Sequence, residues 1–503
     1  MTTNILEYLE ATAERIPDSP AFSDEKLTLS FLEFLKRSRA VGSFLIGKGV
    51  KRRSPVMVIM NKKPDTIAVF FGVVYAGCFY VPIDPDMPPD RVKLITAKLD
   101  PQCVFTDKKN FDPEKYGLTC PVFEPDEAES APLMEEGLRA VRDTSIDTDP
   151  IYVVFTSGST GIPKGVLACH SSVIDYAEAF TGMLKPSVSS VFGMQVPLYV
   201  DACLKEILST IKCGSHTWLI PRSMFMFPVR LVEYLNRHEI NTLCWVVSAL
   251  TIISGLGTFE TIRPSHLSTV CFGSEVFPVR QLALWREVLP ECRFINLYGP
   301  TEATGMSSYY ELPKDRIFGP DDRIPVGKPF KNTRIFLLDD DDKEAIEGEI
   351  CITGRCLTLG YFRDEERTAK AFTQNPLNHD CHELIYRTGD IGRYDENGDL
   401  VFVSRKDSQI KHMGHRIELG EIEQNAGMLE GISSQCCVYD DIRNRIVLYY
   451  TGEAEPKDIM MSLKSKLPSY MLPSKLEKLK VMPVTNNGKI DRSSLRNKAK
   501  EEE

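Results

Sequence analysis

Helix-like and strand-like stretches alternate through the first part of the chain. Residues 5–16 have the apolar periodicity of an amphipathic helix, and residues 54–60 (SPVMVIM) form a short apolar run typical of a strand. Three later runs, at 151–157, 242–248 and 268–274, are apolar on both faces, as buried parallel strands are. This alternation predicts an α/β fold with a largely parallel sheet.

Hairpin-like segments dominate from about Arg334 onward. The turn at 395–399 (DENGD) is a strong hairpin signal, and the four aspartates at 339–342 indicate an exposed turn rather than a metal site. A smaller module follows Arg405. Because 503 residues exceed what one compact core normally holds, we expect at least two domains.

Residues 66–83 (TIAVFFGVVYAGCFYVPI) form an uncharged stretch that approaches the length of a membrane span. Gly72, Gly77 and Pro82 interrupt it, and its last residues resemble a strand. We therefore predict a buried helix, a turn and a strand, and no membrane span.

The amino-acid composition disfavours some classes of function. A formal charge of −10 argues against general nucleic-acid binding. The fourteen cysteines show no zinc-ligand spacing and no secretory signal opens the chain, which favours the cytoplasm and disfavours a structural metal. Residues 457–500 are nonetheless basic, with eleven Lys or Arg against three acids. This segment is either a solvated face or a docking surface for an acidic partner.

The loop at 155–165 (FTSGSTGIPKG) is the most informative stretch. It packs three glycines and four hydroxyl residues into ten positions, so backbone N–H groups, hydroxyls and Lys164 can surround an anion. Pro163 and Gly165 flank the lysine, which excludes a GxxxxGK[ST] phosphate loop, and no GxSxG nucleophile motif is present. We expect phosphate binding; the alternative is a plain surface turn.

Five motifs in order, TSGSTGIPKG, NLYGPTEAT, YRTGD, SRKDSQIKHMGHRIELGEIE and NGKIDR, together resemble the adenylate-forming superfamily. The chain is most similar to amino-acid adenylation domains of nonribosomal peptide synthetases and to D-alanine–carrier-protein ligases. The resemblance covers essentially the whole chain. It implies a large domain (1–405) of parallel-rich sheets with helices and a distorted barrel, and a small mobile α+β lid (406–503) hinged near Asp407. Ser404 replaces the usual glycine of the hinge motif.

The resemblance also implies a reaction and its residues. The carboxyl group of the substrate attacks the α-phosphate of ATP, pyrophosphate leaves, and a phosphopantetheine thiol of a carrier protein then takes the acyl group near Gly414. Catalytic roles fall to Lys489, Thr156 and Glu302, with Glu302 also holding Mg²⁺. The nucleotide would be bound by Ser157, Gly158, Ser159, Thr160, Lys164, Asn296, Tyr298, Gly299, Thr301, Asp390 and Arg405.

Asp201 and Lys205, four residues apart in VDACLKEI, raise a question of substrate. By resemblance Asp201 binds the α-ammonium of an amino acid, and the side-chain pocket consists of Ala202, Lys205, Ser248, Cys271, Gly273, Leu297, Gly305 and Met306. A lysine among small and apolar residues needs a partner, which suggests an acidic amino acid. The alternatives are that Asp201 caps the following helix, or that the two residues form an ordinary ion pair.

Three functions stay open at this point. The first is a stand-alone amino-acid adenylating enzyme that loads an acidic carrier protein in trans, because no fused carrier is visible after NGKIDR. The second is a D-alanine–carrier-protein ligase or an acyl-CoA-synthetase-like ligase. The third is a catalytically idle binding subunit, which the intact motif residues disfavour.

Overall fold

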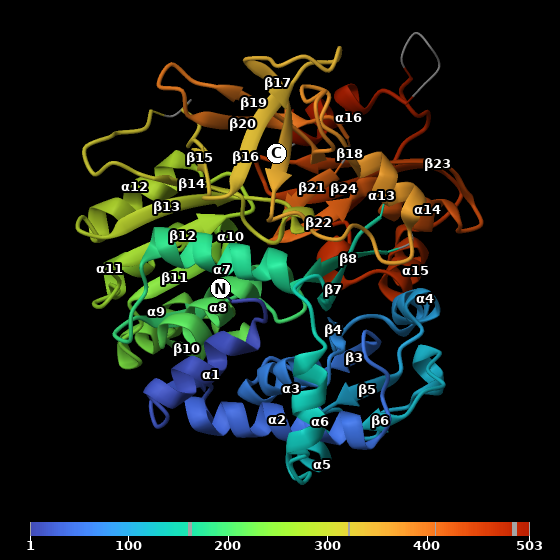
Figure 1. Cartoon of the computed structure of the whole chain (residues 1–503). Coiled ribbons are helices and arrows are strands. Elements are labelled where there is room, and N and C mark those ends of the chain that lie inside the picture. Colours follow the sequence, from blue (N-terminus) through green and yellow to red (C-terminus); the bar gives the residue numbers. More distant parts are fainter. Residues whose placement is uncertain (1, 159–162, 320–321, 408, 485–489, 502–503) are drawn as a thin grey trace.

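The computed structural model describes residues 2–158, 163–319, 322–407, 409–484 and 490–501. Strands in these ranges form five sheets, of nine, six, five, three and two strands (Figure 1). The three larger sheets lie between residues 20 and 405, and the two smaller ones follow residue 408. The predicted α/β fold, with a large sheet-rich part and a smaller C-terminal one, is confirmed.

The nine-stranded sheet brings the ends of several strands to one edge. Its centre contains β9 (Val191–Met194), β10 (His216–Leu219), β11 (Thr242–Val246), β12 (Thr269–Gly273) and β13 (Arg293–Tyr298), paired in parallel. Most of their side chains are buried, in agreement with the predicted apolar runs. The carboxyl ends of parallel strands meet at the same edge of a sheet, where ligands bind in α/β folds.

The six-stranded sheet contains β3 (Pro55–Ile59), β4 (Phe79–Pro82) and β7 (Pro150–Thr156) in parallel, and β8 (Lys164–Cys169) returns antiparallel to β7. The uncharged stretch at 66–83 forms most of α3 (Pro64–Tyr75), a turn and β4, as predicted. Within the described residues, no helix is both long and apolar enough to cross a membrane.

Helices cover the faces of these two sheets (Figure 1). They are α1 (Leu6–Arg15), α2 (Phe31–Gly47), α4 (Pro89–Leu99), α5 (Pro125–Glu129), α6 (Glu135–Asp143), α7 (His170–Leu184), α8 (Leu204–Cys213), α9 (Pro228–Arg237), α10 (Val247–Gly255), α11 (Thr258–Thr261) and α12 (Val279–Val288). The remaining strands of the two sheets are β1 (Pro20–Ser23), β2 (Thr28–Ser30), β5 (Cys103–Thr106), β6 (Val122–Phe123), β14 (Ser308–Glu311) and β15 (Lys328–Pro329).

The five-stranded sheet is built from the predicted hairpins. It comprises β16 (Thr333–Leu338), β17 (Glu347–Gly354), β18 (Phe372–Gln374), β19 (Leu384–Tyr394) and β20 (Leu400–Arg405), with α13 (Glu365–Ala371) before β18. The turn at 395–399 joins β19 to β20, and Gly398 adopts the positive φ of 76° that such a turn requires. The aspartates at 339–342 lie in the turn after β16.

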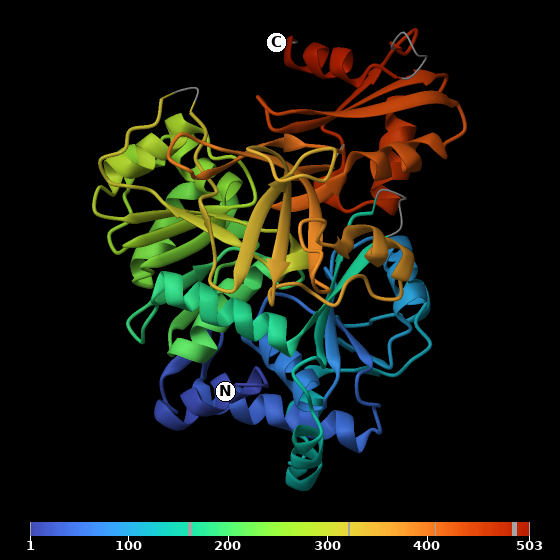
Figure 2. The same ribbon diagram turned by 45° about the horizontal axis from the view of Figure 1, so that its top comes forward.

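The C-terminal module, defined as the described residues from 409 onward, has its own cores. Its elements are β21 (Gln409–His412), β22 (His415–Glu418), α14 (Leu419–Gly427), β23 (Ile432–Asp440), β24 (Arg445–Gly452), α15 (Pro456–Lys466), β25 (Lys475–Lys478) and α16 (Arg492–Glu501). Two of its hydrophobic clusters contain residues from 410 onward and none from the large part. Figure 2 shows the module, orange to red, on one side of the molecule.

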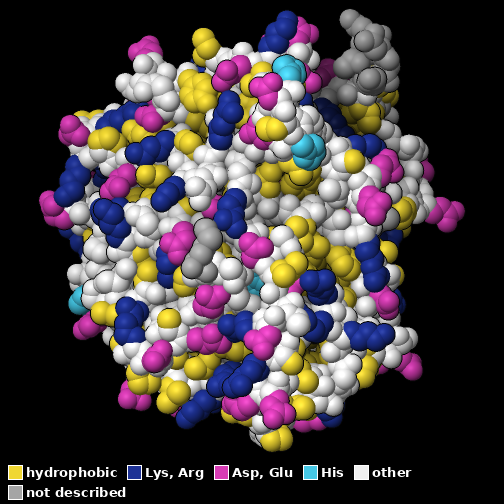
Figure 3. Space-filling view, in the orientation of Figure 1, with side chains coloured by type: hydrophobic (Ala, Val, Ile, Leu, Met, Phe, Trp, Pro, Cys, Tyr) yellow, Lys and Arg dark blue, Asp and Glu magenta, His cyan; other side chains and the backbone are white. Residues whose placement is uncertain are grey.

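Charges of both signs are mixed over the face drawn in Figure 3. Lys and Arg side chains alternate there with Asp and Glu, and the described residues on this face form no continuous basic stripe. The mixed signs are in keeping with a chain that contains 60 Lys and Arg and 70 Asp and Glu.

A close crossing of α2 and α3 gives a test of the fold. A Cβ at Gly72 would overlap Val41 of α2, so Gly72→Ala should lower the free energy of unfolding by ~1–3 kcal/mol. The matched control is Gly182→Ala, in α7, where no atom lies within 4 Å of the added carbon. That change should raise stability by ~0.5–1 kcal/mol. The free energy of unfolding of each variant is measured by denaturant titration. Equal changes in the two variants would contradict the close contact between α2 and α3.

Candidate active site

A cavity of about 100 Å³ lies where the C-terminal module meets the large part. On the large side it is bounded by the loop after β7, by η2 (Asp201–Cys203) and η4 (Thr301–Ala303), and by β19 and β20. The β21–β22 hairpin closes the other side. It brings together eleven residues singled out in the sequence: Thr156, Ser157, Asp201, Ala202, Gly299, Thr301, Gly305, Met306, Asp390, Arg405 and Gly414.

Glu302 follows Thr301, which lines this cavity, and its side chain is completely buried. Its carboxylate accepts hydrogen bonds from Arg416 at 2.7 and 3.0 Å, from Lys164 at 3.2 Å and from the Tyr361 hydroxyl at 2.7 Å. Burial by itself would raise the pKa of Glu302, but Arg416 and Lys164 hold it well below its usual range. The carboxylate therefore stays ionised at every physiological pH.

Lys164 is brought to Glu302 by the β7–β8 pairing, which places it opposite Thr156. Burial, reinforced by the Arg416 charge, lowers the pKa of Lys164 to about 8, while Glu302 opposes that shift. Gly158 lies on the same loop, and Ser159 and Thr160 lie outside the described residues.

A second acidic group, Asp390, is held by two neighbours. Asp390 on β19 is in register with Arg405 on β20, and the two form an ion pair. The Tyr298 hydroxyl donates to the other carboxylate oxygen at 2.6 Å. Arg405 also binds Asp407, at 2.7 and 2.9 Å, so it connects the end of β20 to the segment that leads into the module.

Asn296 and Tyr298 on β13 do not themselves line the cavity. The Asn296 amide nitrogen donates to the Pro325 carbonyl at 2.8 Å, which leaves its amide oxygen for another contact. The Lys411 ammonium from the hairpin lies 5.5 Å from the centre of the Tyr298 ring.

The tip of the β21–β22 hairpin requires glycine. Met413 and Gly414 both have positive φ, 51° and 78°, and a Cβ at Gly414 would lie 2.6 Å from Val246. The Gly414 amide donates to Glu275 at 2.9 Å. The hairpin tip is therefore inserted against the end of β11.

Two further contacts hold the hairpin and α14 on the large part. The Ser157 hydroxyl donates to the Arg416 carbonyl at 2.7 Å and accepts from the Glu418 amide at 3.2 Å. Arg91 of α4 forms a buried ion pair with Glu421 of α14. Burial raises the pKa of Glu421 and Arg91 opposes that shift, so loss of Arg91 would leave an unpaired buried acid.

Asp201 lies in η2 and faces the cavity, whereas Lys205, in the first turn of α8, is buried and does not line it. Helix α8 begins at Leu204 with no side-chain cap, so the alternative that Asp201 caps it is wrong. Among the described residues Lys205 has no acidic partner within 4 Å, which also excludes an ordinary ion pair with Asp201. Burial raises the pKa of Asp201; Thr301 and Lys205 oppose that shift.

Glu206 is a buried acid next to Lys205. It is completely buried, and neither carboxylate oxygen has a hydrogen-bond partner within the described part of the chain. Burial raises the pKa of Glu206 to about 7, with Lys205 and Lys62 opposing the shift. The Lys62 ammonium donates to the carbonyls of Met194 and Gln195 at 3.2 and 3.0 Å. Lys205 thus has as its sequence neighbour a buried acid that is only partly ionised near neutral pH.

The remaining pocket residues expected from the sequence do not reach this cavity. Ser248 donates its backbone amide to Glu275 at 2.7 Å, and Cys271, Gly273 and Leu297 are enclosed in strands β12 and β13. Lys489 lies outside the described residues. The structure therefore assembles the expected nucleotide side of the site more fully than the expected side-chain pocket.

Several lining residues were not singled out from the sequence. They are Asp84, Tyr199, Lys411, His415, Arg416 and Tyr470. His415 stacks on Tyr470 with ring centres 3.7 Å apart and lies 6.3 Å from Tyr199. The cluster of basic residues within the motif at 404–423 is the sequence feature that could have indicated Lys411, His415 and Arg416 as lining residues.

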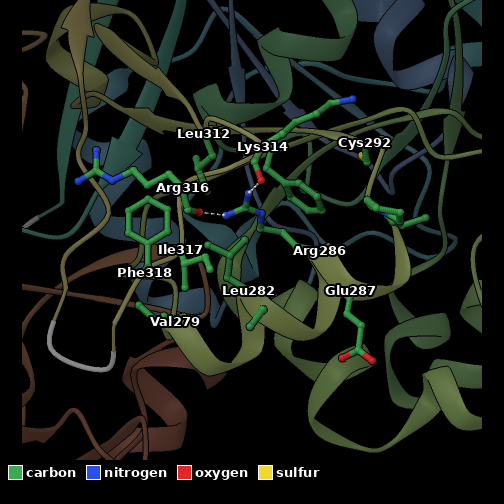
Figure 4. A pocket seen from close by; sticks show the side chains of 14 residues that line it. Val279, Leu282, Arg286, Glu287, Cys292, Leu312, Lys314, Arg316, Ile317 and Phe318 are labelled. Atoms are coloured by element: carbon green, nitrogen blue, oxygen red, sulfur yellow. Dashed lines mark hydrogen bonds between the residues drawn. The ribbon is translucent and has the colours of Figure 1, made fainter.

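A separate hollow of about 330 Å³ lies beside α12, away from this chemistry (Figure 4). Arg286 points into it, but its guanidinium donates to the carbonyls of Arg316, Pro313 and Lys314. Its donors are occupied by the backbone, so the arginine serves to hold the 313–316 loop.

Comparison with protein families gives a match to the AMP-binding enzyme family over residues 9–362. The chain belongs to this family. Relatives of this chain include tyrocidine synthase 1 of Brevibacillus parabrevis, which is 30% identical over 98% of this chain and 45% of the relative. Surfactin synthase subunit 1 of Bacillus subtilis is 29% identical over 98% of this chain and 14% of the relative. This AMP-binding family member thus spans less than half the length of these relatives.

Solved structures share the fold of this AMP-binding family member. A nonribosomal peptide synthetase protein containing adenylation and PCP domains superposes with a TM-score of 0.85 at 22% identity, covering 98% and 84% of the two chains. A mutant o-succinylbenzoate CoA synthetase from Bacillus subtilis gives 0.84 at 19% identity, covering 99% and 98%. The resemblance drawn from the five sequence motifs is confirmed.

The buried His415 stack predicts a pH dependence for closure of the hairpin on the large part. Burial lowers the pKa of His415 from 6.5 to about 4, with the charges of Arg222 and His412 acting in the same direction. The neutral ring is favoured when the hairpin is closed, so closure is strongest above pH 6.5 and weakens as the pH falls toward 4. At pH 5 we expect the free energy of closure to be less favourable by ~1–2 kcal/mol than at pH 7.

Energy transfer between dyes on the large part and on the module measures this closure. The control is His415→Phe, which keeps an aromatic ring in the stack and does not titrate. Its pH profile should be flatter than that of the unmodified protein between pH 7 and 5. Identical profiles for the two proteins would refute this role of His415.

Proposed function

We propose that the chain activates an amino acid with ATP as an aminoacyl-adenylate, releases pyrophosphate, and passes the aminoacyl group to the phosphopantetheine thiol of a separate carrier protein. The observation that carries this proposal is the single cavity in which Asp201 faces Thr156, Thr301 and the Asp390–Arg405 pair. One small molecule in this cavity could place an ammonium group at Asp201 and ribose hydroxyls at Asp390. Its phosphates could accept hydrogen bonds from the threonine hydroxyls.

Asp201 is the proposed anchor of the substrate's α-ammonium group. Its burial makes an isolated negative charge costly, and an ammonium group beside it would remove that cost. Fixing the amine in this way orients the substrate carboxylate toward the loop at 156–158. The nucleophilic oxygen is thereby positioned before reaction, which lowers the entropic part of the barrier.

The nucleotide side of the cavity would bind ATP through the residues expected from the sequence. Asp390, fixed by Arg405 and Tyr298, can accept hydrogen bonds from both ribose hydroxyls. Thr156, Ser157 and Lys164 lie on or beside the loop that would hold the phosphates. Lys489, expected to contact the carboxylate and the α-phosphate, would supply positive charge where negative charge develops.

Glu302 fits the requirements of a Mg²⁺ ligand. Mg²⁺ is commonly held by one or two carboxylates together with substrate phosphates, and Glu302 is an ionised, buried carboxylate next to Thr301 at the cavity. When bound, the ion would neutralise charge on the phosphates. In the arrangement observed, Arg416 and Lys164 bind the same carboxylate oxygens.

The carrier arm is proposed to enter beside Gly414, at the tip of the hairpin. We further propose a division of the chain into 1–405 and 406–503, with the hinge near Asp407, so that the module presents different faces in the two half-reactions. An acidic carrier would complement the basic segment 457–500. Part of that basic charge is already paired internally, since Lys498 and Lys475 bind Glu477 and Arg492 binds Glu423.

A reducing compartment such as the cytoplasm suits the fourteen free thiols.

An acidic substrate side chain is proposed as the partner of Lys205, and Glu206 sharpens this proposal. Burial raises the pKa of Glu206 and lowers that of Lys62, both to about 7, so near neutral pH these two residues together add almost no net charge beside Lys205. A D-alanine–carrier-protein ligase, an acyl-CoA-synthetase-like ligase and an idle binding subunit are the competing functions. The exchange experiment below separates them.

Amino-acid-dependent pyrophosphate exchange over a panel of L- and D-amino acids tests the function. We expect strongest exchange with glutamate or another amino diacid, and Lys205→Met should reduce that preference by roughly tenfold because it removes the buried cation. Asp201→Asn should lower exchange with every amino acid by about a hundredfold, since the ammonium anchor is common to all of them.

The panel also separates the alternatives. Exchange with D-alanine alone would identify the D-alanine ligase reaction. Carboxylic acids that lack an amine are added to the panel, and exchange with these acids alone would identify the acyl-CoA-synthetase reaction. No exchange with any acid would identify a binding subunit. Strong exchange with neutral side chains and none with acidic ones would refute the role given to Lys205.

A further inference from the structure

The hydroxyl group of Tyr176 is buried beside the active-site cavity. Tyr176 lies on α7, on the face that packs into the core, and is 2% exposed. Its ring packs against those of Phe180 and Phe330, with ring centres 5.7 and 6.4 Å apart. Within the described part of the chain, the hydroxyl has no hydrogen-bond partner. An unsatisfied polar group in a protein core is costly and rare, so this hydroxyl is a candidate for binding a ligand.

Gly305 brings this hydroxyl to the wall of the cavity. Gly305 lines the cavity together with Asp201 and Met306. A Cβ added at Gly305 would lie 3.6 Å from the hydroxyl oxygen of Tyr176 and 3.3 Å from the ring carbon that bears it. Gly305 also has a positive φ of 87°, which favours glycine. Because this position has no side chain, the polar end of the Tyr176 ring reaches the cavity wall.

The Tyr176 hydroxyl keeps its proton and is available as a hydrogen-bond donor. Burial raises the pKa of Tyr176 well above its ordinary value, and Cys244, Asp201 and Glu206 act in the same direction. Glu206 does not accept this hydrogen bond, because neither of its carboxylate oxygens has a partner among the described residues. The donor therefore requires an acceptor that the described part of the chain does not supply.

We propose that the Tyr176 hydroxyl donates a hydrogen bond to the side-chain carboxylate of the substrate and acts with Lys205 to select an amino diacid, an inference that rests on the proposed function. Asp201, the proposed anchor of the α-ammonium group, lines the same cavity as Gly305. A carboxylate can accept hydrogen bonds from an ammonium group and a hydroxyl at once, since each of its oxygens is an acceptor.

The same hydroxyl disfavours neutral side chains. A hydrocarbon or thioether side chain beside Tyr176 would leave the donor without a strong acceptor, whereas a carboxylate would satisfy it. Sites built to form a hydrogen bond with a substrate group discriminate strongly against analogues that lack that group. Tyr176 is thus a specificity-determining residue in this proposal, distinct from the residues that bind the nucleotide.

Pyrophosphate exchange tests this role when kcat/KM is measured with methionine and with glutamate, or with whichever amino diacid gives the strongest exchange. Tyr176→Phe should lower kcat/KM for the diacid by about tenfold to a hundredfold, mainly through a higher KM, because a hydrogen bond to a charged group is lost. The value for methionine should stay unchanged. A loss of folded protein would lower both values equally, so their ratio reports on the hydroxyl alone.

Tyr234→Phe is the matched control. Tyr234 on α9 is also buried, and its hydroxyl likewise has no hydrogen-bond partner within the described ranges. Its ring packs against Trp218 and His238, and none of these three residues lines the cavity. This variant should therefore keep the ratio of the diacid to methionine that the unmodified protein shows.

Three results would overturn the role given to Tyr176 and leave the proposed function intact. They are an unchanged ratio in Tyr176→Phe, an equal fall with both amino acids, and exchange by the unmodified protein with neutral side chains only. Absence of exchange with every amino acid would instead refute the proposed function, and this inference with it. A lower ratio in Tyr176→Phe and an unchanged ratio in Tyr234→Phe would support the proposal.

Discussion

The arrangement of the active site depends on one buried carboxylate, that of Glu302. A fully buried negative charge is tolerated only when cations and hydrogen-bond donors surround it, and here those donors come from three separate parts of the chain. Lys164 comes from β8, Tyr361 from the segment after β17, and Arg416 from the C-terminal hairpin. The requirement to neutralise one charge thus draws together the six-stranded sheet, the hairpin-rich sheet and the C-terminal module.

This constraint connects the position of the module to the nucleotide site. Ser157 and Glu302, which we expect to serve phosphate and Mg²⁺, are the residues that bind the hairpin backbone and Arg416 in this structure. Arg416 donates to both oxygens of the Glu302 carboxylate, so the position of the hairpin is coupled directly to this group. The hairpin is held on its other side by the close approach of Gly414 to Val246 at the end of β11.

Much of the fold could be predicted from the sequence because apolar periodicity directly reflects burial. The runs at 242–248 and 268–274 lie in the parallel strands expected, and the turn at 395–399 joins a hairpin as its residues indicate. The ordered motifs named the residues expected on the nucleotide side, and the structure brings several of them, such as Thr156, Thr301 and Asp390, to one cavity. The environment of Lys205 could not be predicted, because it depends on how α8 packs against distant strands. Within the part of the chain that the structure describes, Lys205 has no ion-pair partner and Glu206 is completely buried.

Direct detection of the intermediate tests the central claim most sharply. The protein is incubated with ATP, Mg²⁺ and an amino-acid mixture in the absence of any thiol, and the bound nucleotides are identified by mass spectrometry. Our account predicts an aminoacyl-adenylate retained by the protein, with pyrophosphate in solution. Formation of ADP and inorganic phosphate, or recovery of unreacted ATP with every amino acid, would contradict it.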